Sequence, residues 1–193
     1  SMWVQDLKPD RLTRALREVR GLLERLDGDR VGVIAFSGDA RLVAPLTHDR
    51  TTLTHFVETL SPEDNMVGGT DVGGALERAL ELFDGRSGSH EAICLLTDGE
   101  DLEGGGLVVA ERAAELGIRV YVVGMGTADG GKIPGSGGFV RDEAGQEVVS
   151  ALGGETLRAI AEATGGEYLS AEMSPFPLEE LYRKRISRMD SRE

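Results

Sequence analysis

The chain has 193 residues, of which 40% are hydrophobic, and its formal net charge is -13. This length allows one domain with a sizeable core, and the acidic balance argues against nucleic acid as a partner, because phosphates attract a basic surface. The single cysteine, Cys94, excludes an internal disulfide and a four-thiolate metal site, and its position within an apolar run predicts a small buried thiol.

The first half of the chain predicts a helix, a hairpin and two further helices. Leucine and valine recur at helical spacing over residues 12–26, between Pro9 and a breaker at 27–29. Two apolar segments, RVGVIAFSG and ARLVAPLT, follow one another across a Gly-Asp turn and predict a pair of antiparallel strands. Residues 53–60 and 72–83 have the spacing of two helices, joined by the loop EDNMVGGTD.

The second half alternates strands with helices. EAICLLTD and IRVYVVGMG predict strands that are apolar on both faces, separated by a helix over residues 107–116. A small extra hairpin is expected near 138–150, followed by a helix over 156–164, a short strand over 167–170 and a basic helix from residue 178. This order predicts an α/β fold with a doubly wound, mostly parallel sheet flanked by helices.

Hydroxyl and carboxyl oxygens occur where such a sheet binds ligands, beyond the carboxyl ends of its strands. Asp98 ends an apolar strand, Thr70 lies in a glycine-rich loop before a helix, and Ser1 would share that edge if a strand preceded it. An oxygen-only set suits Mg²⁺ or Mn²⁺ better than zinc or copper. In the simpler interpretation, which spacing alone favours, Asp98 caps the following loop while Glu100 and Asp101 are solvated.

Other chemistries have less support in the sequence. The three histidines, His48, His55 and His90, are scattered and lack metal-ligand spacing. Ser136 lies among glycines but outside a G-x-S-x-G frame. The glycines of VGMGTADGG miss the dinucleotide-binding spacing, and no phosphate-binding lysine motif is present.

The GGTD loop, the apolar strand ending LLTDGED and the order of the elements resemble a von Willebrand factor A (VWA) domain. That family carries a metal-ion-dependent adhesion site (MIDAS), formed by D-x-S-x-S after the first strand, a threonine in a later loop and an aspartate after the fourth strand. Thr70 and Asp98 match the later two positions, and Ser1 matches the last serine of D-x-S-x-S. GDRVGVIAFSGDARLVAPLT, GGFVRDEAGQEV and LYRKRISRMDSRE also resemble bacterial aerotolerance (Bat-type) membrane proteins.

The resemblance implies that the first central strand is missing and that the domain is truncated at both ends. A VWA-like domain is expected over residues 1–177, and a basic helix leading out of it over 178–193. We expect the resulting gap in the sheet to expose Ile93 and Leu95 and to leave backbone groups unpaired. This stretch of chain should then bind Mg²⁺ poorly and tend to aggregate.

By the same resemblance, the chain is a non-enzymatic, metal-ion-dependent protein-interaction module of a membrane-anchored bacterial protein. Ser1, Thr70 and Asp98 would hold Mg²⁺ or Mn²⁺, and an open coordination position would take a carboxylate from a partner protein. The family's partners include other Bat-type proteins and a MoxR-type AAA+ ATPase.

Two alternatives stay open. One is a Mg²⁺-dependent hydrolase or phosphoryl-transfer enzyme with Asp98 as a metal ligand, and the other is a structural module with a vestigial metal site. The enzyme would need a basic residue to grip phosphate, and the sequence around Thr70 and Asp98 offers none.

Overall fold

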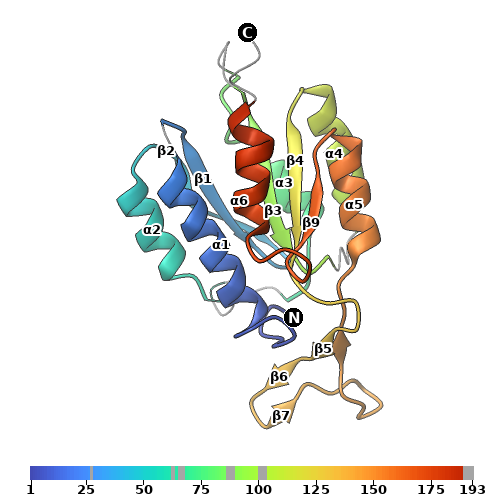
Figure 1. Cartoon of the computed structure of the whole chain (residues 1–193). Coiled ribbons are helices and arrows are strands. Elements are labelled where there is room, and N and C mark those ends of the chain that lie inside the picture. The colour runs from blue at the N-terminus through green and yellow to red at the C-terminus, as the bar shows by residue number, and fades with distance from the viewer. Residues whose placement is uncertain (27, 62–63, 65–67, 86–89, 100–103, 189–193) are drawn as a thin grey trace.

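The computed structural model describes residues 1–26, 28–61, 64, 68–85, 90–99 and 104–188 (Figure 1). The elements expected from the sequence are all present in these ranges. In chain order they are α1 (Arg11–Arg25), β1 (Val31–Phe36), β2 (Ala40–Thr47), α2 (Arg50–Glu58), α3 (Val72–Leu80), β3 (Ala92–Thr97), α4 (Gly106–Glu115), β4 (Arg119–Gly124), β5 (Gly131–Lys132), β6 (Pro134–Gly135), β7 (Gly138–Phe139), β8 (Val149–Ser150), α5 (Gly154–Ala163), β9 (Tyr168–Ser170), α6 (Pro177–Lys184) and a 3₁₀ helix (Ile186–Arg188).

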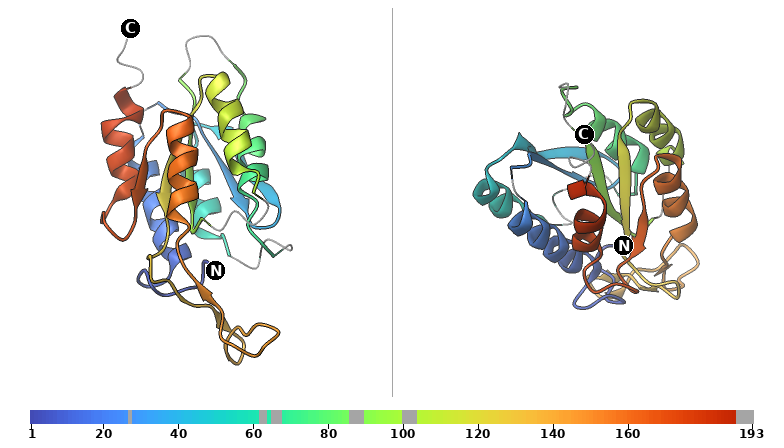
Figure 2. Two further views of the ribbon diagram at one scale, coloured as in Figure 1. Left: turned by 90° about the vertical axis from the view of Figure 1, so that its right-hand side faces the viewer. Right: turned by 45° about the horizontal axis from the view of Figure 1, so that its top comes forward.

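A parallel sheet lies between two layers of helices, as the sequence predicts. Its order is β3-β4-β9, and both pairs of neighbours are parallel. β1 and β2 form a separate antiparallel pair. Helices α1, α2 and α6 pack on one side, and α3, α4 and α5 pack on the other (Figures 1 and 2). The α/β, doubly wound fold class is therefore confirmed.

Side chains alternate between the two cores along β3, which corrects the expected exposure of Ile93 and Leu95. These residues are only 8% and 5% exposed, because they face the core beneath α3, α4 and α5. Cys94 points to the opposite core and is half-buried, and burial raises the pKa of its thiol to about 12. Among the described residues, no strand pairs with β3 on the side away from β4.

Helix α1 buries the expected Leu23 and ends at the buried Leu26, but its fully buried stripe is shifted from the expected one in the first turns. The leucine and valine spacing predicts that Leu12, Leu16 and Val19 face inward, yet each of them is only half-buried. The buried positions instead begin at Arg11 and continue through Ala15, Glu18, Leu22 and Leu23. A charged residue therefore occupies the first core-facing position of the helix.

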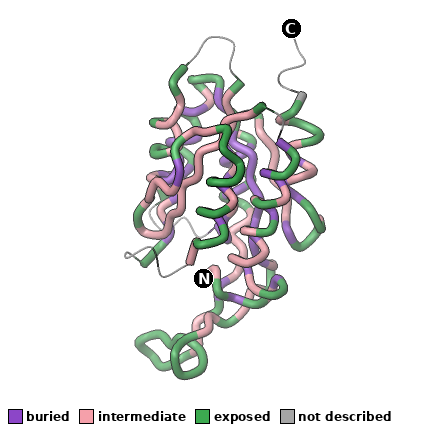
Figure 3. Tube along the Cα trace, turned by 90° about the vertical axis from the view of Figure 1, so that its left-hand side faces the viewer, coloured by how far each residue is buried: buried purple, intermediate pink, exposed green. Residues whose placement is uncertain are grey.

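Residues 131–150 form an arm that projects from one end of the body (Figures 1 and 2). Two short antiparallel pairs, β5-β8 and β6-β7, build it, and a bridge between Arg141 and Glu147 closes its turn. The hairpin is thus confirmed, although it begins earlier than residue 138. Its tip is largely exposed, as Figure 3 shows.

The segment from residue 178 begins as a helix on the body of the protein. Leu178 and Leu181 of α6 are each 1% exposed and join the core that α1 and α2 cover. The division into 1–177 and 178–193 stays a prediction. Within the part of the chain that the structure describes, no helix has both the length and the apolar character needed to cross a membrane.

Candidate metal centre

Asp98 lies directly after β3, at the carboxyl end of the parallel sheet. The residue is 2% exposed. Its backbone carbonyl accepts a hydrogen bond from the Gly153 amide at 2.9 Å, which ties it to the start of α5. The chain terminus marked N and the arm lie at this same end of the molecule (Figure 1). Glu100 and Asp101, the other two acids of this segment, lie outside the described residues.

Thr70 lies at the same end, immediately before α3, and is 8% exposed. Asp71 caps α3 by accepting a hydrogen bond from the Gly74 amide at 2.7 Å, and the Asp71 amide donates to the Ser37 carbonyl. The first turns of α3 and α4 touch, because a Cβ on Gly73 would stand 3.0 Å from the Gly105 carbonyl carbon.

Ser1 is exposed at the start of a segment that folds back on α1. The Ser1 carbonyl accepts a hydrogen bond from Val4, and the Met2 carbonyl accepts one from Leu12. Among the described residues, no hydrogen bond joins the side chains of Ser1, Thr70 and Asp98. That the three residues act as one set of ligands stays a prediction.

Arg11 contacts the Asp98 carboxylate, which corrects the expectation that no basic residue lies near it. Arg11 is fully buried, and its Nη1 donates to Asp98 Oδ2 at 3.2 Å. The two residues are 87 positions apart, so inspection of the sequence around Asp98 could not find the pair. Nη1 also donates to Ser150 Oγ at 2.9 Å, and Nη2 donates to the Ser150 carbonyl at 2.8 Å.

Asp6 is the second carboxylate on Arg11. Its two oxygens accept from Arg11 Nε at 2.9 Å and Nη2 at 2.7 Å, and Oδ2 also accepts from the Thr127 amide. Burial alone would raise the pKa of Asp6, but Arg11 and Thr127 outweigh it and the pKa is lowered. Burial alone would lower the pKa of Arg11. The hydrogen bonds that Arg11 donates to Asp6 and Asp98, and the negative charges of these two residues, outweigh burial and raise the pKa.

One signal in the sequence could have identified this cluster. Arg11 lies four residues before Ala15 and seven before Glu18, so it continues the buried stripe of α1. A buried guanidinium requires a carboxylate partner. Nothing in the sequence alone indicates that the partner is Asp98.

The hydroxyl and carboxylate oxygens of Ser1, Thr70 and Asp98 are donor types that suit a hard divalent cation. Asp98 Oδ1 accepts no hydrogen bond from any residue that the structure describes, whereas Oδ2 accepts from Arg11. Within the same described ranges, no group of three His, Cys, Asp or Glu side chains is placed to hold a metal ion. An ion at Asp98 would consequently need neutral oxygens, such as the hydroxyls of Thr70 and Ser1, and such a set suits Mg²⁺ or Mn²⁺.

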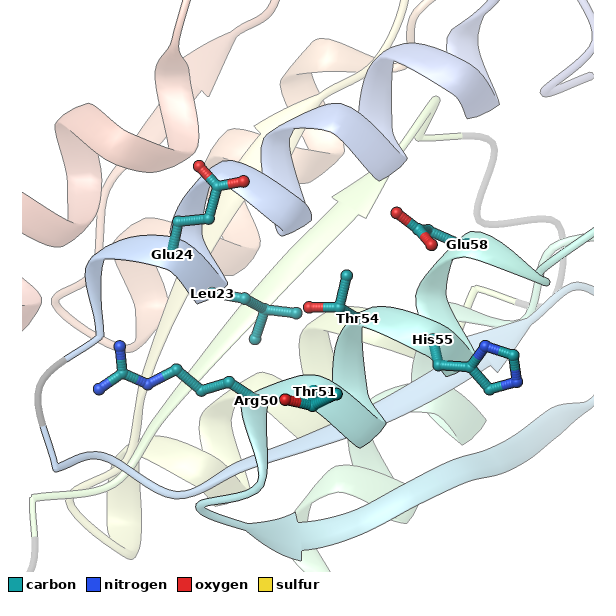
Figure 4. Close-up of a pocket in the computed structure, with 7 residues that line it drawn as sticks. All are labelled: Leu23, Glu24, Arg50, Thr51, Thr54, His55 and Glu58. Atoms are coloured by element: carbon teal, nitrogen blue, oxygen red, sulfur yellow. The ribbon is translucent and has the colours of Figure 1, made fainter.

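A hollow of about 460 Å³ lies elsewhere, between α1 and α2 (Figure 4). It is open to solvent, and its lining residues are Leu23, Glu24, Arg50, Thr51, Thr54, His55 and Glu58. None of the predicted metal ligands contributes to this lining. The hollow is therefore separate from the candidate metal centre.

These features define a class of protein: an α/β domain with a central parallel sheet between two layers of helices and a buried aspartate directly after β3. The chain belongs to the von Willebrand factor type A domain family, which matches residues 1–100. The resemblance found in the sequence is confirmed.

Solved structures of Bat-type proteins are similar along nearly the whole chain. BatB from Bacteroides thetaiotaomicron, a conserved hypothetical protein, is 36% identical with a TM-score of 0.93, and the match covers 99% of this chain and 94% of that one. An aerotolerance-related membrane protein from Bacteroides fragilis, with multiple mutations to serine, is 34% identical with a TM-score of 0.90, over 95% and 92% of the two chains.

More distant similarity concerns the fold alone. Proximal thread matrix protein 1 from the mussel byssus, with zinc in its MIDAS motif, is 17% identical with a TM-score of 0.60, over 93% of this chain and 39% of that one. The chain also matches two curated relatives at 26% and 27% identity, and it spans only 36% and 52% of their length.

Proposed function

We propose that the chain is a non-enzymatic, metal-ion-dependent protein-interaction module of a membrane-anchored bacterial protein. A divalent cation, Mg²⁺ or Mn²⁺, is held at Asp98 with the hydroxyls of Thr70 and Ser1. The ion keeps most of its positive charge, since hydroxyl ligands are neutral, and it takes a carboxylate from a partner protein. The buried Asp98 carboxylate, with one oxygen free of hydrogen bonds from the described residues, is the observation that carries this proposal.

Membrane attachment and partner identity are further parts of the proposal. The similarity to an aerotolerance-related membrane protein supports a domain carried at the cell membrane. Other Bat-type proteins and a MoxR-type AAA+ ATPase are the partners we propose, each presenting an acidic side chain.

The chemistry around Asp98 favours binding over phosphoryl transfer. Arg11 is the basic residue that an enzyme could use, but all five of its N–H groups already donate to Asp6, Asp98 and Ser150. A fully buried guanidinium without a free donor offers no grip for a substrate phosphate.

The first test uses Mn²⁺ as the probe, titrated calorimetrically up to millimolar concentrations. We expect Asp98→Asn to weaken Mn²⁺ binding by at least about tenfold, since it removes the only charged ligand. Thr70→Val, which removes a hydroxyl at nearly constant volume, should also weaken it. Asp129→Asn is the matched control, because Asp129 is an exposed acid in the loop after β4.

The outcomes separate the candidate functions. Equal Mn²⁺ binding by the parent and Asp98→Asn would contradict the proposal. Hydrolysis of a generic phosphoester that requires Mg²⁺ and Asp98 would favour the enzyme instead.

A further inference from the structure

The Arg11 guanidinium is held rigidly against the carboxylate that we assign to the cation. Asp6 binds it through two oxygens, and Ser150 accepts from both terminal nitrogens, at 2.9 Å and 2.8 Å. Arg11 is 0% exposed. The side chain therefore has neither the space nor the free hydrogen bonds to move away when another cation approaches.

The charge of this cluster remains negative. Two buried carboxylates, Asp6 and Asp98, share one guanidinium, with closest N–O distances of 2.7 Å and 3.2 Å. Asp6 has the shorter, two-oxygen contact, so the positive charge of the guanidinium neutralises Asp6 more than it neutralises Asp98. Asp98 keeps the larger share of the uncompensated charge, which can attract a second cation.

We propose that Arg11 sets the affinity of the cation site, by occupying Asp98 Oδ2 and by repelling a divalent ion bound through Oδ1. The inference rests on the proposed function, because it assigns the ion to Asp98. Repulsion between two cations that share one carboxylate is strong in a poorly solvated site. The consequence is a weak site for the ion alone.

A weak site makes the ion depend on the partner. A carboxylate from the partner adds one negative charge on the open side of the ion and offsets the repulsion by Arg11. The ion and the acidic partner then bind cooperatively, since each raises the affinity of the protein for the other. Arg11 is thus a positioning residue that links metal binding to partner binding.

The test replaces the buried ion pair with neutral side chains of similar size. The variant Asp6→Asn/Arg11→Met leaves the net charge unchanged, keeps an acceptor for Thr127 and removes the guanidinium from Asp98. A second variant, Asp6→Asn/Arg11→Gln, keeps amide donors in the same space. Circular dichroism and a thermal melt establish that each variant is folded before Mn²⁺ is titrated.

We expect either folded double variant to bind Mn²⁺ at least about tenfold more tightly than the parent. Arg11→Lys, which retains the positive charge, should stay within about threefold of the parent. The control Arg25→Gln/Glu179→Gln removes a surface pair of the same charges, 2.9 Å apart between α1 and α6, and should leave Mn²⁺ affinity unchanged.

The possible failures are distinguishable. Equal or weaker Mn²⁺ binding by the folded double variants, together with loss of binding in Asp98→Asn, would overturn the role of Arg11 and leave the cation site intact. Absence of Mn²⁺ binding from the parent and from both double variants would overturn the role of Arg11 and the proposed function together. If Arg11→Lys bound Mn²⁺ as tightly as the double variants, the positive charge at position 11 would not be the cause of the weak binding, and the proposal would be overturned.

Discussion

Asp6 contributes to stability through the charge of Arg11 and the amide of Thr127. Asp6 lies five residues before Arg11 and 121 before Thr127, and nothing in the sequence indicates that it pairs with either of them. Thr70 and Asp98 were predictable, because a glycine-rich loop and a strand end each place a polar residue at the carboxyl edge of a sheet. Arg11, Asp6 and Ser150 were not, since their contacts join segments that only the tertiary fold brings together.

The lowered pKa of Asp6 predicts a pH dependence of stability. A carboxyl whose pKa is lower in the folded state stabilises the fold above its unfolded pKa, about 4, and this contribution is lost as the pH falls. We expect Asp6→Asn to lower the free energy of unfolding by about 3 kcal/mol at pH 7, because it leaves a buried charge poorly paired. The difference from the parent should shrink as the pH falls below about 4, where Asp6 of the unfolded chain takes up a proton, and should vanish once Asp6 of the folded parent is protonated as well.

Urea denaturation of both proteins across this pH range measures the effect. Asp129→Asn controls for the loss of an acid from the surface. A difference between parent and Asp6→Asn that is constant from neutral to acid pH would contradict the assigned role of the Asp6 charge.

At the scale of elements, strands and helices were predictable from hydrophobic periodicity, but the face that each one buries was less so. The apolar run of β3 does not tell which residues face which core, and the structure alternates them. The stripe of α1 is displaced toward Arg11 because a hydrogen-bonded cluster, rather than a leucine, fills its first core-facing position. Periodicity reports apolar residues and overlooks a buried charge that is paired through the tertiary fold.

The contact between α3 and α4 gives a second prediction. Gly73→Ala should lower the free energy of unfolding by about 1 kcal/mol, because its Cβ would press on the Gly105 backbone at 3.0 Å. The same change should weaken Mn²⁺ binding, since it displaces the first turn of α3, which directly follows Thr70 and Asp71.

Gly21 in α1 is the matched control. A Cβ there would meet nothing within 4 Å, so Gly21→Ala should raise the free energy of unfolding by about 1 kcal/mol through helix propensity alone. Thermal melts and Mn²⁺ titrations compare the two variants. A stabilising Gly73→Ala with unchanged Mn²⁺ binding would mean that the α3–α4 contact does not support the site.

At the scale of the whole molecule, two cores on opposite faces of the sheet leave its carboxyl end, where Asp98 follows β3, as the place for the proposed cation site. The order of helices and strands was enough to predict this layered arrangement. The arm projects from the same end, and its foot at Ser150 is bound to Arg11. The expectation that this stretch of chain aggregates stays a prediction.

The central claim is that separated oxygens at this end hold one hard cation. The most direct measurement is a crystal structure of the protein in Mn²⁺, with the ion located by its anomalous scattering. The account predicts a single strong peak next to both the Thr70 hydroxyl and Asp98 Oδ1, directly or through one water, and no peak at this position in Asp98→Asn. A peak elsewhere, with none beside Asp98, would contradict the account.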